Sequence, residues 1–207
     1  MEKLKICFFA SHSGSNMQAI INSVESGTLD AEIKCLITNN SNSYSIQRAI
    51  NHNFPYYHIS SMKFPDKSDF TNEIKRVLDL NGVNIIVLAG YMKLLPTEII
   101  EYMNGRVLNI HPALLPKFGG EGMWGMNVHK AVIEAGDKES GATIHLVDSQ
   151  YDRGRIIGQK KLSINENETP ESLSSRVLEL EHQLYSEVLM KISNGEIEIN
   201  PMKIKMI

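Results

Sequence analysis

The sequence predicts an α/β fold in which a mostly parallel sheet is covered by helices on both faces. Short apolar runs alternate with amphipathic stretches through the first half of the chain, the pattern of strand–helix–strand units with right-handed crossovers. Residues 84–88 are mostly β-branched and apolar, which is typical of a parallel strand buried on both faces. Residues Pro170–Ser193 carry an apolar stripe that predicts one long covering helix.

The first half of the chain alternates strands and helices regularly. In the first expected helix, apolar residues recur at i, i+3, i+4 and i+7 from Met17 to Val24. The second expected strand ends at the turn-forming residues 39–42. In order, we expect a strand at 4–10, a helix at 16–25, a strand at 33–38, a helix at 45–51, a strand at 56–59, a helix at 69–80 and a strand at 84–88.

The second half is less regular and contains a glycine-rich loop at 117–126. A strand at Val107–His111 is expected to stop at Pro112, and Gly136 is expected to end a helix. The other expected elements are a helix at 96–103, a helix at 127–135, strands at 142–147 and 155–161 around a turn at 148–154, the helix Pro170–Ser193 and a short strand within 197–207.

Composition bounds the class of protein. The 207 residues are 42% hydrophobic and 22% charged, which suits one globular domain over 1–207. The longest apolar run, 85–89, is far shorter than the ~20 residues of a membrane span, and the N-terminal run is too short for a signal peptide. We interpret Cys7 and Cys35 as buried thiols in a reducing, cytoplasmic environment. The net charge of −3, without a basic stripe, disfavours a general nucleic-acid binder.

The turn at 11–16 is a candidate anion site, because it follows the first strand and opens the first helix. Unpaired N–H groups and the helix dipole favour an anion there. Gly14 allows close approach of the backbone, and Ser15 and Asn16 can add side-chain hydrogen bonds. The alternative is an ordinary helix cap made by a serine. The turn matches neither the Walker loop nor the dinucleotide-binding fingerprint.

Asn109 and His111 are candidate catalytic residues. They close a strand on the same face, so an amide donor and a proton-transferring imidazole lie side by side. Asp152, in the turn 148–154, gains a role if it reaches His111, where a carboxylate favours the charged imidazole. A structural His-Pro and a simple turn are the alternatives. His145 is interpreted as either a core or a site residue.

Neither a metal site nor a serine nucleophile is expected. The sequence contains no His-x-x-x-His or Cys-x-x-Cys pair and no Gly-x-Ser-x-Gly elbow. His129 and His182, on expected helices, are interpreted as ordinary hydrogen-bonded or solvated histidines.

Several motifs occur together in an order that resembles the phosphoribosylglycinamide formyltransferases, within the folate-dependent formyltransferases. The resemblance runs from about Lys5 to Gly195. It implies a Rossmann-like sheet and transfer of a formyl group from 10-formyltetrahydrofolate to glycinamide ribonucleotide in purine biosynthesis, without a metal. The matching segments are LNIHPALLP at 108–116, SGSNMQAI at 13–20, LAGYM at 88–92, GATIH at 141–145, and Asp152 followed by Gly154.

The resemblance also implies roles for individual residues. Asn109 and His111 would face the formyl carbonyl, and Asp152 would tune His111. Contacts to the two substrates would come from residues on several elements: Gly14, Ser15 and Asn16 for the ribose phosphate, Glu181 for the ribose, Met92, Lys93, Leu94, Leu95 and Asn109 for the folate, and Lys67 for its carboxylated tail.

The chain departs from the family pattern at a few positions. His12 stands where many members have a small residue, Lys93 where arginine is common, and Asn127 where histidine is frequent. The loop 118–127 is longer than the Pro-Gly-x-His form of better-known members. These changes leave the three catalytic candidates in place and affect the expected substrate contacts.

Four rival functions use related folds. Formyltetrahydrofolate hydrolase is expected to carry an N-terminal regulatory domain, and methionyl-tRNA formyltransferase a C-terminal RNA-binding domain with more positive charge. A sugar-nucleotide formyltransferase is expected to be longer. A nucleotide-binding regulatory module would not need Asn109, His111 and Asp152 together. We expect small-molecule substrates only, and a monomer or a homodimer.

Overall fold

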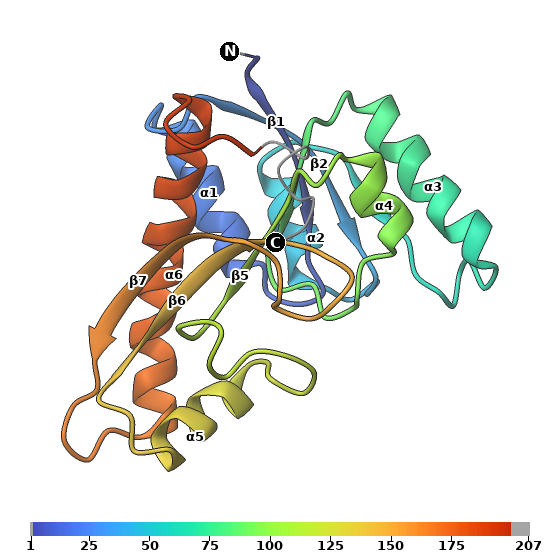
Figure 1. Cartoon of the computed structure of the whole chain (residues 1–207). Helices are drawn as coiled ribbons and strands as arrows, with labels where there is room; N and C mark the ends of the chain where they lie inside the picture. Colours follow the sequence, from blue (N-terminus) through green and yellow to red (C-terminus); the bar gives the residue numbers. More distant parts are fainter. Residues whose placement is uncertain (1, 200–207) are drawn as a thin grey trace.

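One seven-stranded sheet, in the order β3-β2-β1-β4-β5-β6-β7, runs through the computed structural model, which describes residues 2–199 (Figure 1). The neighbours from β3 to β5 are parallel, whereas β6 pairs antiparallel with both β5 and β7. The strands are β1 (Leu4–Phe9), β2 (Ala31–Thr38), β3 (Tyr56–His58), β4 (Ile85–Leu88), β5 (Val107–His111), β6 (Glu139–Leu146) and β7 (Ile156–Ser163).

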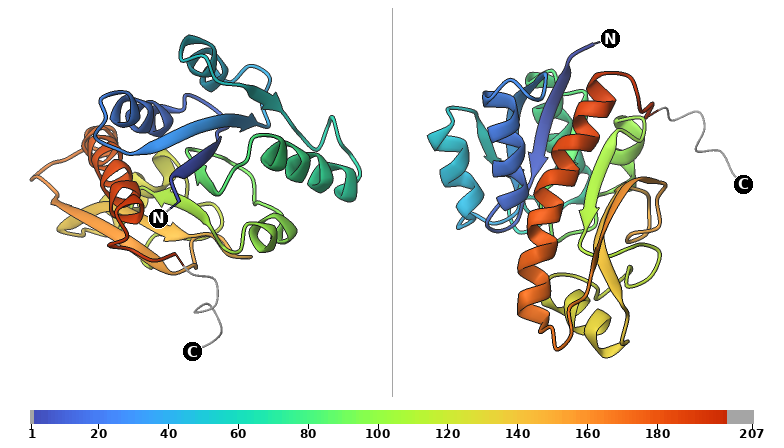
Figure 2. Two further views of the ribbon diagram at one scale, coloured as in Figure 1. Left: turned by 90° about the horizontal axis from the view of Figure 1, so that it is seen from above. Right: turned by 90° about the vertical axis from the view of Figure 1, so that its left-hand side faces the viewer.

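Helices cover both faces of the sheet, as Figure 2 shows from above. On one face, residues of α1, α2 and α6 pack against alternate residues of β1 such as Ile6 and Phe8. On the other face, α3 and α4 pack against Cys7 and Phe9. The helices are α1 (Ser15–Glu25), α2 (Tyr44–Asn51), α3 (Lys67–Leu80), α4 (Thr97–Tyr102), α5 (Met126–Glu134) and α6 (Pro170–Ser193). The predicted fold class is therefore confirmed.

Helix α6 runs along the sheet and reaches the end that carries α5 (Figures 1 and 2). The Thr169 side chain caps it by accepting from the Ser172 N–H, and Pro170 occupies its first turn. Within the helix, the buried Tyr185 hydroxyl lies 3.1 Å from the Leu88 carbonyl oxygen and 3.0 Å from that of Leu108. This hydroxyl fixes α6 over the last residue of β4 and the second residue of β5.

The strand order reverses at β1, which has β2 on one side and β4 on the other. In open α/β sheets, ligands bind outside the carboxyl ends of the strands at such a switch point. The turn after β1 and the end of β5 both lie at the carboxyl ends of the parallel strands. The topology therefore brings together two segments that the sequence predicts to be part of the site.

Element boundaries differ from the predictions by a few residues. Strand β6 starts at Glu139 rather than at residue 142, because Glu139 pairs with Ser163 of β7 across the hairpin. Helix α3 starts at Lys67 rather than at residue 69, because the Asp66 carboxylate accepts the N–H groups of the first turn. Of the strand expected within 197–207, residues 197–199 form no strand and the rest lie outside the described residues.

The two cysteines are buried, as expected, on neighbouring strands. Cys7 pairs in register with Cys35, and their sulfur atoms lie 3.4 Å apart. None of the helices within residues 2–199 combines the length and the apolar character that crossing a membrane requires.

Candidate active site

A cavity of about 830 Å³ lies at the carboxyl ends of β1, β4 and β5. Its lining comes from the turn before α1, the ends of β4 and β5, the glycine-rich loop, α5, the turn after β6 and α6. The lining residues are His12, Ser13, Ser15, Asn16, Gly90, Tyr91, Met92, Asn109, Ile110, His111, Pro112, Gly120, Glu121, Met123, Trp124, Gly125, His129, Tyr151, Asp152, Ser174, Leu178 and Glu181.

Gly14 gives the turn after β1 its shape. Its φ of 64° and ψ of 37° are left-handed values that favour glycine, and an added Cβ would lie 3.0 Å from the Ser45 Cβ. The backbone N–H groups at the start of α1 have no partner within the helix and carry the positive end of its dipole. Ser15 and Asn16, at the start of α1, therefore line the cavity where free backbone N–H groups suit an anion.

A buried carboxyl group lies beside this turn. The Asn16 Nδ2 donates to Glu181 Oε2 over 2.7 Å, while Asn16 Oδ1 is buried and has no hydrogen-bond partner among residues 2–199. Burial raises the pKa of Glu181 to about 7, against the lowering effect of the Asn16 bond. An acid held near neutrality can accept or donate a hydrogen bond to a ligand, and Asn16 Oδ1 offers a further acceptor.

His111, at the end of β5, faces hydrogen-bond acceptors with both ring nitrogens. Its Nδ1 lies 3.3 Å from Asp152 Oδ2, and its Nε2 donates to the Phe118 carbonyl over 2.8 Å. Burial lowers the pKa of His111, and the Asp152 charge and the Phe118 carbonyl oppose this without reversing it. The expected contact between His111 and Asp152 is thus present, and Asp152 has the expected effect of favouring the charged ring, but burial outweighs it and the pKa of His111 is lowered overall.

Asp152 lies between two histidines. Its Oδ2 accepts the Gly120 N–H over 3.0 Å, and its Oδ1 lies 3.5 Å from His145 Nε2. Burial alone would raise the pKa of Asp152, but the neighbouring rings of His145 and His111 and the Gly120 N–H lower it. Gly154 allows this turn to close, because a Cβ there would lie 1.8 Å from the Leu146 carbonyl oxygen.

Two further histidines, His145 and His129, lie near this centre. His145 is 2% exposed, and its Nε2 lies 3.1 Å from the Asn109 Nδ2. His129, on α5, lines the cavity with a buried, unpartnered Nδ1, and burial followed by the charge of His111 lowers its pKa. The antiparallel pairing of β5 with β6 places His145 opposite Asn109. Knowledge of this register would have predicted that His145 is a site residue.

Several residues named from the sequence lie outside the cavity lining. Lys67 Nζ is paired with Glu98 at 2.6 Å, Lys93 and Leu94 are exposed, and Leu95 is buried against α3 and α4. Their contacts to a folate stay predictions. In their neighbourhood Met92 lines the cavity together with Tyr91, whose pKa burial raises to about 12.

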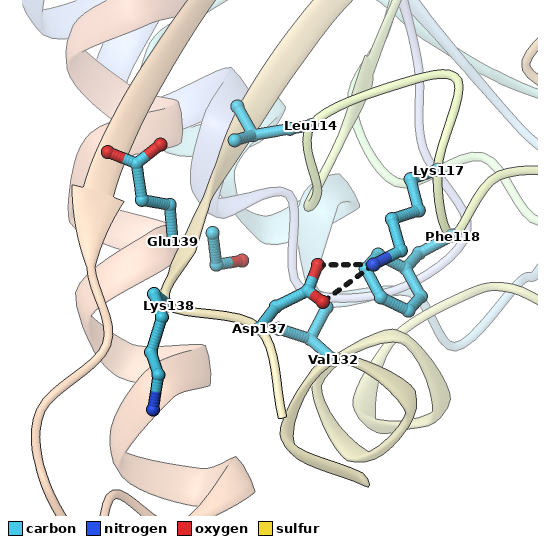
Figure 3. Close-up of a pocket in the computed structure, with 8 residues that line it drawn as sticks. Leu114, Lys117, Phe118, Val132, Asp137, Lys138 and Glu139 are labelled. Carbon is cyan, nitrogen blue, oxygen red and sulfur yellow. Dashed lines mark hydrogen bonds and ion pairs between the residues drawn. The ribbon is translucent and has the colours of Figure 1, made fainter. Parts of the chain in front are cut away.

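A second cavity, of about 390 Å³, is lined by residues of the segments 114–118 and 132–140 (Figure 3). The Lys117 ammonium group meets both carboxylate oxygens of Asp137 at its edge, at 2.6 and 2.7 Å. It is also lined by Leu114, Val132 and the buried Ser140, whose hydroxyl has no partner in the described part of the chain. Within residues 2–199, no three His, Cys, Asp or Glu side chains are grouped so that they could hold a metal ion.

The model of the formyl transferase family matches residues 4–189 of the chain. The chain belongs to the formyl transferase family. This confirms the resemblance seen in the sequence, and the match includes the end of β5, the turn after β6 and most of α6.

Relatives within the formyl transferase family agree with this assignment. The chain is 40% identical over 195 residues to a chloroplastic phosphoribosylglycinamide formyltransferase of Arabidopsis thaliana, covering 94% of this chain and 67% of that protein. It is 35% identical to a phosphoribosylglycinamide formyltransferase of Haemophilus influenzae, covering 94% and 90%. The chain spans only 61% of a Vigna unguiculata relative and 19% of a chicken trifunctional purine biosynthetic protein.

Solved structures of the family have the same fold. The structure of a phosphoribosylglycinamide formyltransferase from Coxiella burnetii matches with a TM-score of 0.86 and 38% identity, covering 94% of this chain and 89% of that one. A formyltetrahydrofolate deformylase from Pseudomonas syringae matches with a TM-score of 0.84 and 25% identity, but this chain covers only 64% of it.

Proposed function

We propose that the chain is a phosphoribosylglycinamide formyltransferase that transfers the formyl group of 10-formyltetrahydrofolate to the amine of glycinamide ribonucleotide, in de novo purine (IMP) biosynthesis. The main observation behind this proposal is that the three catalytic candidates, Asn109, His111 and Asp152, line the same cavity as the first turn of α1. Relatives named for this activity support it. In this proposal 10-formyltetrahydrofolate is a co-substrate and not a resident cofactor.

In the proposed reaction, the acceptor amine attacks the formyl carbon and a new C–N bond forms. Negative charge develops on the formyl oxygen, which an Asn109 N–H stabilises. The bond between the formyl carbon and the folate nitrogen then breaks, as a proton moves from the attacking nitrogen to the leaving one. One oriented donor is worth ~2.7–4 kcal/mol of barrier in such reactions.

His111 is the proton carrier in this scheme, with Asp152 as its charge partner. The lowered pKa of His111 favours a neutral ring in which Nε2 carries the proton and donates a hydrogen bond to the Phe118 carbonyl. When substrate replaces that carbonyl, the ring carries its proton on Nδ1, beside Asp152, so that Nε2 is free to take the proton of the attacking amine and to pass it to the leaving nitrogen. Asp152, only 9% exposed, stabilises the imidazolium that forms when the ring takes up a proton.

The proposed substrate positions are those that the family resemblance implies. Gly14, Ser15 and Asn16 would hold the phosphate at the start of α1, and Glu181 would bond a ribose hydroxyl. The folate would lie against Met92 and the backbone of the segment that follows it. Lys67 would reach the folate tail only after leaving its pair with Glu98.

The decisive experiment assays formyl transfer to glycinamide ribonucleotide from 10-formyltetrahydrofolate. We expect transfer by the wild-type protein and a loss of kcat on the order of 10²–10⁴ in His111→Ala. Release of formate without transfer would indicate a hydrolase instead. Near-normal kcat in His111→Ala would contradict the assigned mechanism. A cytoplasmic location, a single domain over 1–207 and a monomer or homodimer stay predictions.

A further inference from the structure

His145 lies beside the proposed reacting centre and has no role in the mechanism above. Its Nδ1 lies 2.8 Å from the Leu146 carbonyl oxygen. Because a carbonyl oxygen only accepts hydrogen bonds, Nδ1 must carry the proton and donate. In the neutral ring this leaves Nε2 as an acceptor, so the Leu146 carbonyl selects the tautomer of His145.

Asn109 is the donor that this acceptor meets. Its Nδ2 lies 3.1 Å from His145 Nε2, within the ordinary hydrogen-bond range of roughly 2.7–3.2 Å. Asp152 Oδ1 is farther from the same nitrogen, at 3.5 Å, and two acceptors would face each other there in the neutral ring. The contact between Asn109 and His145 therefore defines the orientation of the amide.

An amide nitrogen carries two hydrogens. When His145 takes one of them, the plane of the Asn109 amide is fixed and the direction of the second N–H is fixed with it. We propose that His145 is a positioning residue for formyl transfer, because its Nε2 holds the Asn109 amide so that the second N–H meets the developing oxyanion. This inference rests on the proposed function and assigns the supporting group of its oxyanion donor.

Two substitutions at the same buried position separate positioning from packing. In His145→Gln, the side-chain oxygen can occupy the place of Nε2 and accept from Asn109. In His145→Asn, the shorter side chain reaches only the place of Nδ1 and leaves the Asn109 amide without an acceptor. Both substitutions remove the ring, so similar losses of thermal stability are expected from packing.

We expect His145→Asn to lower kcat by about 10- to 100-fold, with the KM values for both substrates nearly unchanged, because a misdirected oxyanion donor is lost only in the transition state. His145→Gln should stay within about threefold of wild type, since the acceptor is restored. Equal losses of kcat in the two variants would show that only the ring matters and would overturn the proposal.

A double-mutant cycle identifies the residue through which His145 acts. In an Asn109→Ala background, His145→Asn should lower kcat no further, because the amide that it positions is absent. A full additional loss in that background would mean that His145 acts through Asp152 or another group, and the proposal would be wrong.

A measurement on the wild-type protein covers the case in which the variants fail to fold. Nitrogen-15 NMR should show the Nδ1–H tautomer of His145 and a scalar coupling between His145 Nε2 and Asn109 Nδ2 across their hydrogen bond. An Nε2–H tautomer, or no coupling, would overturn the inference. This readout needs no activity, so it tests the hydrogen bond separately from the proposed function: a protein that shows the coupling but transfers no formyl group would contradict the proposed function and not the contact.

Discussion

Substitution of Glu181 by glutamine tests the buried acid of the cavity. Burial raises the pKa of Glu181 from 4.5 to about 7, with the Asn16 hydrogen bond as a smaller opposing effect. The folded protein thus binds this proton more tightly than the unfolded chain. The Glu181 contribution to the free energy of unfolding therefore falls as the pH rises from about 4.5 to about 7 and stays low above it. Linkage with these two pKa values gives a loss of about 2.5 kcal/mol between pH 5 and pH 8.

In Glu181→Gln the side chain keeps its shape and still accepts from Asn16, but it cannot ionise. We expect the free energy of unfolding of the variant, relative to that of wild type, to increase by about 2.5 kcal/mol from pH 5 to pH 8. Urea unfolding of both proteins at both pH values measures this difference. Glu179→Gln, at an exposed position on the same helix, serves as the matched control and should follow wild type. Parallel pH dependences of wild type and Glu181→Gln would refute the reasoning.

Three further substitutions address other parts of the site. Gly14→Val places a branched side chain at φ 64°, within 3.0 Å of Ser45, and should raise KM for the phosphorylated substrate more than for the folate; steady-state kinetics in which both rise equally would contradict it. Asp152→Asn removes the charge that raises the pKa of His111, so the His111 pKa should fall further and the acidic limb of the pH–rate profile should move to lower pH. An acidic limb at the wild-type pH would contradict this pairing. Ser140→Ala removes a buried hydroxyl that has no partner, so thermal melting should show an unchanged or slightly raised Tm, whereas a clear loss would reveal a partner for it.

Local sequence patterns predicted most of the fold because the elements bury periodic apolar faces. Helix α6 has the predicted bounds, since Thr169 and Pro170 are local start signals. The start of β6 was missed because it depends on pairing with β7, and the exposed Glu139 carries no apolar signal of its own. Long-range pairing of this kind is not encoded in a short window of sequence.

The residues of the candidate site also differ in whether local sequence or long-range pairing determines their position. Asn109 and His111 could be paired from the sequence because the period of two in a strand places them on one face. The role of His145 depends on the register between β5 and β6, which the residues around it do not reveal. The net pKa direction of His111 was also out of reach, because it depends on how deeply the ring is buried.

Trp124, in the glycine-rich loop, lines the larger cavity and is 54% exposed. It is also the only tryptophan among the 207 residues. Fluorescence excited selectively through tryptophan therefore comes from a single indole in the lining of the larger cavity. Occupancy by either substrate should change its emission wavelength or quenching by iodide, so the order in which the two ligands bind can be followed in stopped flow without any added label.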